Sequence, residues 1–218
     1  MFIGHFAPAF AAAAVSRRAP KLGTLFIAAQ LVDWAFFAFA IVGIEAMRIE
    51  PGATAMVPFD LYNMPYTHSL LGSGIWAVVF GLLVFALLRD AVAGLLAGLV
   101  VLSHWILDFL THRPDLTLAG GDQVYGLGLW NLPWVAIPLE IGITVGAIYW
   151  YMKRTQGPIG PPLVLLAVLL IMQAINWFAP HPAEASLGLY IQALAAFGVV
   201  TLIARWVGDN RKHKRARG

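Results

Sequence analysis

The sequence predicts an all-α protein, a polytopic bundle of transmembrane helices. Hydrophobic residues make up 60% of the 218 residues and charged residues only 11%, whereas a soluble domain carries about 25% charged residues. The apolar residues gather into long segments, each near the roughly 20 residues that cross a bilayer. These segments are apolar on every face. Because lipid offers no hydrogen-bond partners, their backbone groups must be satisfied internally, which favours α-helices.

The first element is short. Residues 1–16 are apolar and end at Arg17 and Arg18, whereas a secretory signal peptide carries its charge before the apolar stretch. We therefore expect residues 1–16 to form a short hydrophobic helix that starts within the outer leaflet and descends to these arginines. It should form a tight hairpin with the next segment, as a seventh, incomplete crossing.

Six long helices follow the short one. They are expected over residues 22–44, 70–88, 91–111, 129–152, 162–179 and 186–207. Two glycine pairs, Gly94–Gly98 and Gly142–Gly146, predict close packing of helix backbones. Two connections, 45–69 and 112–128, are long enough to be structured. No linker or internal repeat divides the chain, so residues 1–218 are expected to form one membrane domain.

Basic residues are concentrated in alternate loops. Arg48 and Arg113 are the exceptions among the 14 lysines and arginines. The other twelve are Arg17, Arg18, Lys21, Arg89, Lys153, Arg154, Arg205, Arg211, Lys212, Lys214, Arg215 and Arg217. The positive-inside rule therefore predicts that these loops and the C-terminus are cytoplasmic. The basic tail, residues 209–218, favours contact with anionic membrane lipids over binding of nucleic acid.

Several ionisable side chains fall inside the apolar segments, where they are costly and therefore candidates for function. A rise of about 1.5 Å per residue places four of them at one depth, about 18–21 Å from the nearest charge at the cytoplasmic end. These four are His5, Asp33, His104 and Glu140. Because different segments supply them at the same level, we expect them to converge. Asp108 lies one turn further out, and His68 and His112 stand at outer helix ends.

The strongest local pattern is His104, Asp108 and His112. Their spacing of four residues puts all three on one helix face. Imidazole nitrogen and carboxylate oxygen at this spacing predict a divalent metal site, which suits zinc, with manganese or iron as alternatives. The chain has no cysteine, so thiolate ligands and cysteine nucleophiles are excluded. The alternative interpretation is a buried structural bond between His104 and Asp108.

Neighbouring segments could complete the coordination of one or two metal ions. His5, Asp33 and His68 are the candidate ligands there. Glu140 or His112 is the candidate acid/base partner, and Glu140 could instead orient a histidine. His181 and His213 are expected to be surface residues. Asp60 and the turn at 113–115 are expected to fold over the site.

These residues resemble the bacterial family of membrane-bound metal-dependent hydrolases, which includes LexA-regulated inner-membrane hydrolases. The matching pieces are Gly4-His5, Asp33, Tyr66-Thr67-His68-Ser69 and Ser103-His104-x-x-x-Asp108. Their order is also similar to that in zinc-dependent phospholipase C, where such residues bind zinc that activates water. The resemblance covers about residues 1–115. The chain departs from the family pattern around Asp33, where a Pro-Asp-x-Asp tract is usual and one carboxylate is missing here.

The resemblance implies a hydrolase of the bacterial inner membrane that cleaves a phosphoester or ester by metal-activated water. A site that opens to the outer leaflet favours a lipid or lipid-linked substrate, since such molecules reach it laterally. Two alternatives remain. One is an ion- or proton-coupled transporter or channel that uses the same buried groups, although no internal repeat supports it. The other is a non-catalytic membrane protein in which a metal or polar network ties helices together.

Overall fold

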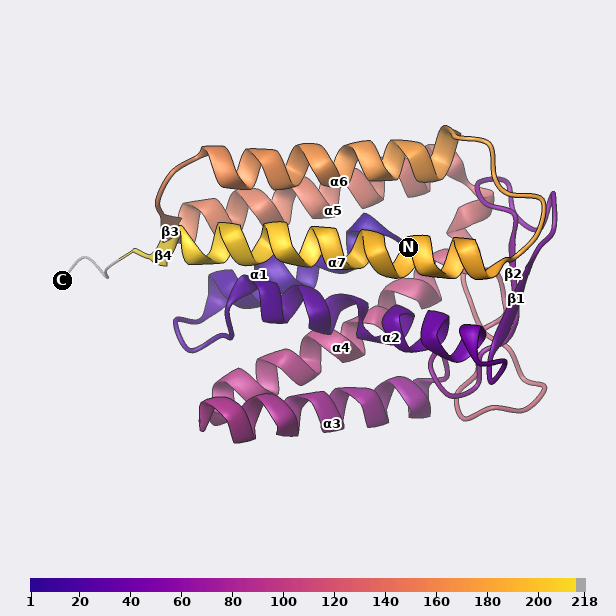
Figure 1. The fold of residues 1–218 in the computed structure, drawn as a ribbon, viewed down its shortest axis with the longest axis horizontal. Coiled ribbons are helices and arrows are strands. Elements are labelled where there is room, and N and C mark those ends of the chain that lie inside the picture. Colours follow the sequence, from indigo (N-terminus) through magenta and orange to yellow (C-terminus); the bar gives the residue numbers. More distant parts are fainter. Residues whose placement is uncertain (215–218) are drawn as a thin grey trace.

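The computed structural model describes residues 1–214 and confirms the all-α fold (Figure 1). Arg215 and Arg217 of the predicted basic tail lie outside the described residues. The elements, in chain order, are η1 (Ile3–Phe6), α1 (Ala7–Val15), α2 (Leu22–Ile41), β1 (Ala46–Ile49), β2 (Phe59–Asn63), α3 (Leu70–Leu88), α4 (Ala91–Thr111), η2 (Leu129–Asn131), α5 (Pro133–Arg154), β3 (Thr155–Gln156), α6 (Gly160–Phe178), α7 (Leu187–Asp209) and β4 (Lys212–His213).

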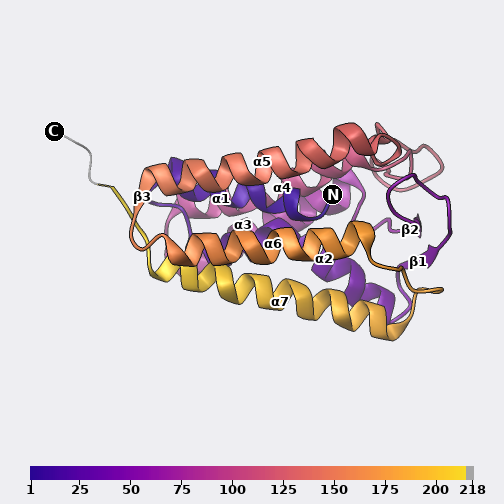
Figure 2. The same ribbon diagram turned by 90° about the horizontal axis from the view of Figure 1, so that it is seen from above.

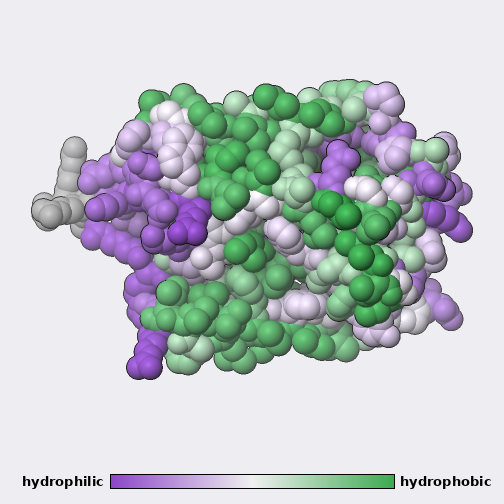
Figure 3. Space-filling model, viewed as in Figure 1, coloured by the Kyte–Doolittle hydropathy of each residue, from purple (hydrophilic) through white to green (hydrophobic). Residues whose placement is uncertain are grey.

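The chain is a multi-pass membrane protein. Among the described residues, the six helices α2 to α7 are long and apolar enough to cross a membrane. Their long axes run in roughly one direction, and loops and short strands occupy the two ends (Figures 1 and 2). Apolar residues cover much of the middle of the molecule, while hydrophilic residues gather at both ends (Figure 3). Outward side chains such as Leu82 and Leu202 expose 61% and 66% of their surface, as lipid-facing residues do.

Two helix boundaries differ from prediction by three or four residues, and every other helix end lies within two residues of its predicted position. Helix α2 ends at Ile41 rather than at residue 44, because Gly43 takes a positive φ of 75°. The N–H groups of Gly43 and Ile44 return to the carbonyls of Ala40 and Phe39, which is the Schellman ending that glycine favours. Helix α5 begins at Pro133 rather than at residue 129, because proline lacks an N–H and fits the first helical turn.

The two long connections are structured, as expected, and they include strands that the sequence did not predict. Strands β1 and β2 form an antiparallel hairpin in which Arg48 lies opposite Asp60. In the second connection, Leu116 forms an isolated bridge with Tyr125. Both connections lie at the same end of the bundle. At the other end, β3 pairs with β4, which belongs to the predicted basic tail.

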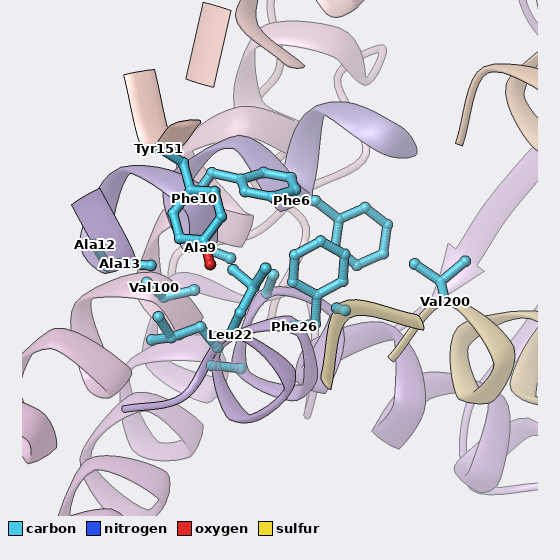
Figure 4. Close-up of a cluster of buried hydrophobic side chains, with 14 of the residues drawn as sticks. Phe6, Ala9, Phe10, Ala12, Ala13, Leu22, Phe26, Val100, Tyr151 and Val200 are labelled. Carbon is cyan, nitrogen blue, oxygen red and sulfur yellow. The ribbon is translucent and has the colours of Figure 1, made fainter. Parts of the chain in front are cut away.

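The short N-terminal helix is confirmed. The chain begins in the middle of the bundle (Figure 1), and η1 and α1 run to Val15, where they pack against α2 and α5. Phe6 and Phe10 pack on Phe26 of α2 with ring centroids 4.4 and 5.2 Å apart. This aromatic group is the centre of the apolar core, together with Tyr151 (Figure 4). It fixes η1 deep inside the molecule.

Helices α3 and α4 form a hairpin whose backbones nearly touch. A Cβ added to Gly94 would lie 2.7 Å from the carbonyl oxygen of Gly81, and one added to Gly98 would lie 2.9 Å from that of Ala77. The prediction of close packing is therefore confirmed for Gly94–Gly98. It was wrong for Gly142–Gly146, because a Cβ at either position meets nothing within 4 Å among the described residues.

Candidate metal centre

The structure brings all five predicted ligands together. The contributing elements are η1 with His5, α2 with Asp33, the turn before α3 with His68, and α4 with His104 and Asp108. All are buried except Asp33, whose side chain is 20% exposed. Local structure explains the placement: the side chains four residues apart on α4 share a face, and the Ser69 cap at the start of α3 fixes the turn that carries His68.

Asp108 lies at the centre of the cluster. Its Oδ1 is 3.0 Å from Nε2 of His5 and 3.4 Å from Nε2 of His112. The Met1 nitrogen lies 2.8 Å from the same oxygen. The other oxygen, Oδ2, is 3.0 Å from Nε2 of His104. One carboxylate therefore faces three imidazole rings at close range.

Asp33 supplies a second carboxylate to the same histidines. Its Oδ1 lies 3.3 Å from Nε2 of His68 and 3.5 Å from Nε2 of His104. The possible ligand atoms form two groups, His5–His104–Asp108 and Asp33–His68–His104, each with all atoms within 4.8 Å of one another. Two nitrogen or oxygen ligands of one tetrahedral zinc ion lie roughly 3.3 Å apart. Because His104 belongs to both groups, the cluster could hold one ion or two.

Hydrogen bonds on the far side of two rings indicate their tautomers. The Nδ1 atom of His104 lies 2.9 Å from the Ala29 carbonyl oxygen, which can only accept a hydrogen bond. The Nδ1 atom of His112 lies 2.9 Å from Oδ1 of Asp115. Each Nδ1 therefore carries the hydrogen, which leaves a lone pair on Nε2 of the neutral ring. In both cases Nε2 is the atom that faces Asp108.

His68 is oriented through a longer chain of contacts. Its Nδ1 lies 2.8 Å from Oγ1 of Thr67, and that hydroxyl lies 2.6 Å from Oε2 of Glu45. A carboxylate can only accept, so Thr67 donates to Glu45 and accepts from His68. Glu45 also accepts from the backbone N–H groups of Tyr66 and Thr67. His68 therefore presents the lone pair of Nε2 to the site.

This arrangement fits a metal ion. Lone pairs on three Nε2 atoms face carboxylate oxygens, and two acceptors repel each other unless a cation or a proton lies between them. Nε2 of His104 is buried and makes no well-aligned hydrogen bond, although it lies 3.0 Å from Oδ2 of Asp108. The His5 and His104 rings stack at 3.7 Å, so a positive charge on both would be unfavourable. Nitrogen and carboxylate donors suit zinc, and also manganese or iron.

The two predicted acid/base residues both lie at the cluster. Oε1 of Glu140 accepts hydrogen bonds from the N–H groups of Phe2 and Gly4, at 2.6 and 3.1 Å, and so holds η1 in place. Burial opposes protonation of His112, but the Asp108 and Asp115 carboxylates outweigh it and raise the pKa of His112. The position of His112 beside Asp108 also makes it a possible ligand.

A cavity of about 230 Å³ adjoins the cluster. Its polar side is formed by Asp33, His68, Asp108, His112 and Glu140. The rest of its wall is mainly apolar and comes from α2, α6, α7 and the β1–β2 hairpin, with Phe37, Phe59, Trp177, Leu189 and Phe197 among its residues. The cavity thus joins a polar, acceptor-rich floor to an aromatic and aliphatic wall.

The two long connections fold against this site, as expected. Asp60 is buried and pairs with Arg48 at 2.5 Å, and it also accepts a hydrogen bond from Arg113. Asp115, two residues after Arg113, accepts a hydrogen bond from Nδ1 of His112. The hairpin is therefore linked by charged contacts to a histidine of the cluster.

The remaining histidines lie elsewhere. His181 packs edge-on against Phe59, and His213 lies in β4 at the opposite end of the bundle. Sequence reasoning missed the orienting roles of Glu45, Thr67 and Asp115. Asp115 alone carried a signal, because it stands three residues after His112 at the end of a helix.

Comparisons with protein-family models, curated proteins and solved structures gave no match. The cluster and its cavity are therefore the basis for assigning a function.

Proposed function

We propose that this chain is a metal-dependent hydrolase of the bacterial inner membrane that cleaves an ester or phosphoester bond by metal-activated water. The observation that carries the proposal is that His68 and His104, each oriented through Nδ1 by a separate partner, direct Nε2 at the carboxylates of Asp33 and Asp108. The proposed ligands are His5, Asp33, His68, His104 and Asp108. Metal-binding histidines in proteins are oriented in this way, by a hydrogen bond on the other nitrogen.

When bound, a divalent ion would polarise the scissile group and lower the pKa of a water molecule to about 7. The chain's own residues would move the protons. Hydrolysis adds the water hydroxyl to phosphorus or to the acyl carbon and requires a proton for the leaving oxygen. Glu140 is placed to accept a proton, because it lines the cavity and Oε2 makes no hydrogen bond within residues 1–214. His112 is the proposed donor: its raised pKa favours a proton on Nε2 that can pass to the leaving oxygen, while Asp115 fixes the ring through Nδ1.

The cavity supports a lipid or lipid-linked substrate. Its wall includes Asn176 and Trp177 of α6 together with Leu189 and Ala193 of α7, and these two helices diverge towards the end that carries the hairpin (Figure 2). A chain-bearing molecule could enter between them from the bilayer, with its ester near Asp108 and its apolar part against the aromatic wall. The positive-inside rule supports an outer-leaflet position for this entrance and a cytoplasmic C-terminus.

Metal analysis of purified variants tests the proposal. We expect His104→Ala and Asp108→Ala each to lose most of the bound zinc, manganese or iron measured by mass spectrometry. His181→Ala removes a histidine outside the cluster and should retain the metal content of the unsubstituted protein. Equal metal content in all of these proteins would contradict the ligand assignment.

Activity is measured separately on the same proteins in detergent micelles. Release of product from short-chain phospholipids and acyl esters should be lost in His104→Ala and retained in His181→Ala. If the unsubstituted protein binds metal and the His104→Ala and Asp108→Ala variants lose it, but no substrate is hydrolysed, the result would instead support a structural metal. Ion flux through proteoliposomes that depends on Asp33 would support a transporter.

A further inference from the structure

A second cavity lies at the opposite end of the molecule, the end predicted to be cytoplasmic. Its volume is about 400 Å³, larger than that of the cavity at the metal centre. The loop between α1 and α2, the end of α5, the end of α7 and β4 form its wall. The residues are Ala13, Ser16, Arg17, Ala19, Pro20, Lys21, Leu22, Tyr151, Thr155, Gly208, Asp209, Arg211, Lys212 and His213.

The charge of this wall is strongly positive. Arg17, Lys21, Arg211 and Lys212 contribute four basic groups, and Asp209 is the one acidic residue in the wall. Asp209 is already engaged, because Lys21 lies 2.6 Å from its Oδ1 and Arg205 lies 3.7 Å from its Oδ2. The wall therefore keeps an excess of positive charge.

Arg211 is the most informative of these residues, because it is only 8% exposed. Its guanidinium donates to Oγ1 of Thr155 at 2.9 Å and to the carbonyls of Gly157 and Pro158 at 3.0 and 2.7 Å. Two further bonds reach the carbonyls of Met152 and Thr155. All five acceptors are neutral, and no carboxylate among residues 1–214 lies within salt-bridge distance. A buried charge without a counter-charge is costly, so an anion beside it would be stabilising.

The cavity is already formed by the fold. The Arg17 guanidinium donates to the carbonyl of Lys214 and so joins the α1–α2 loop to the residue that follows β4. Gly157 lets β3 and β4 approach closely, because a Cβ there would lie 2.3 Å from the carbonyl oxygen of Asn210. A preformed site loses little conformational entropy on binding.

We infer that this cavity binds the phosphate of an anionic membrane lipid. Arginine and lysine are the side chains that recognise phosphate, and the hydroxyls of Ser16 and Thr155 add further polar groups. The apolar part of the wall, which includes Ala13, Pro20 and Leu22, suits the glycerol and first acyl carbons of a lipid. This inference concerns a different part of the molecule from the metal centre and does not depend on hydrolysis.

Titration of the purified protein with dioctanoyl phosphatidic acid tests the inference, with dioctanoyl phosphatidylcholine and inorganic phosphate as the comparison ligands. The variant Arg17→Gln/Lys212→Gln removes two exposed cations of the cavity. The matched control, Arg89→Gln/Lys153→Gln, removes two cations from the same predicted side of the membrane but outside the cavity wall. Both proteins should fold, which the midpoint of thermal unfolding checks.

We expect the cavity variant to bind phosphatidic acid about tenfold more weakly, because it loses one or two charge-assisted contacts. The dissociation constant of the control variant should stay within about twofold of that of the unsubstituted protein. Phosphatidylcholine should bind more weakly than phosphatidic acid, because its choline charge opposes the wall. Equal losses in the two variants would show diffuse attraction by the basic face and overturn the site. Binding of inorganic phosphate as tight as that of phosphatidic acid would assign the cavity to free phosphate instead of a lipid.

Discussion

A neutral histidine presents one lone pair to a cation, and for three histidines of the cluster the hydrogen-bond partner of Nδ1 decides that Nε2 carries it. Nδ1 of His104 donates to the backbone carbonyl of Ala29, and Nδ1 of His112 donates to the carboxylate of Asp115. Nδ1 of His68 donates to the hydroxyl of Thr67. The threonine is the most informative to change, because its hydroxyl connects His68 to the buried Glu45 and has no role in binding a cation itself.

Replacing Thr67 by valine keeps the side-chain shape and removes this connection. We expect Thr67→Val to raise the dissociation constant for zinc by about 10- to 100-fold, the usual effect of losing such an orienting partner. Competition with a chromogenic zinc indicator measures this change. Thr144→Val is the matched control, since Thr144 is equally buried but its hydroxyl bonds only to its own helix, at Glu140. Unchanged zinc affinity in Thr67→Val would contradict the orienting role.

At this scale the candidate ligands could be predicted from sequence, whereas their orienting partners could not. Histidine and aspartate are conspicuous inside apolar segments because their burial is costly. Glu45 and Thr67 belong to a polar connection where such residues are ordinary. Their importance follows only from a contact between residues 21 positions or more apart, which local sequence pattern does not encode.

At the scale of elements, the α3–α4 hairpin carries two of the proposed ligands and is held by contact between backbones. Glycine is required where a Cβ would clash, and the two glycine pairs of the chain differ in this respect. The surroundings of Gly94 leave no room for a methyl group, whereas those of Gly142 are open.

The variant Gly94→Ala should therefore destabilise the protein, by about 1–3 kcal/mol as overpacking does. A Cβ at this position would lie 2.8 Å from Cβ of Phe85 as well as against the Gly81 carbonyl, so the two helices must separate. Gly142→Ala should be neutral or slightly stabilising, since alanine is the better helix former. Thermal unfolding in detergent compares them, and equal midpoints would refute the packing argument.

The helices themselves were predictable, because an apolar run of about 20 residues has few alternatives in lipid. The positions of the helix ends were less predictable. Gly43 ends α2 earlier than predicted, and Pro133 starts α5 later. Glycine and proline are standard signals for the end and the start of a helix, but a prediction from hydropathy alone does not use them. The β1–β2 hairpin lacked a clear period-2 pattern, and its pairing depends on Asp60 reaching Arg48 and Arg113.

For the whole molecule, the uneven distribution of basic residues predicts which end faces the cytoplasm. The chain lacks cysteine, so single cysteines can report on each end. A membrane-impermeant maleimide should label Asp122→Cys in right-side-out spheroplasts, because this exposed residue lies in the 112–128 connection. Gln156→Cys, exposed in β3, should react only in inverted vesicles. The reverse pattern of labelling would invert the predicted topology and place the basic cavity outside.

The depth of the cluster has a consequence for how the protein would acquire its ion. The cavity beside Asp108 is bounded by hairpin residues such as Val57 and Phe59, while the N-terminal helix and its aromatic core fill the other half of the bundle. The packed rings therefore block entry from the basic end. In the topology that the positive-inside rule predicts, a metal ion would then reach the proposed ligands from outside the cytoplasm.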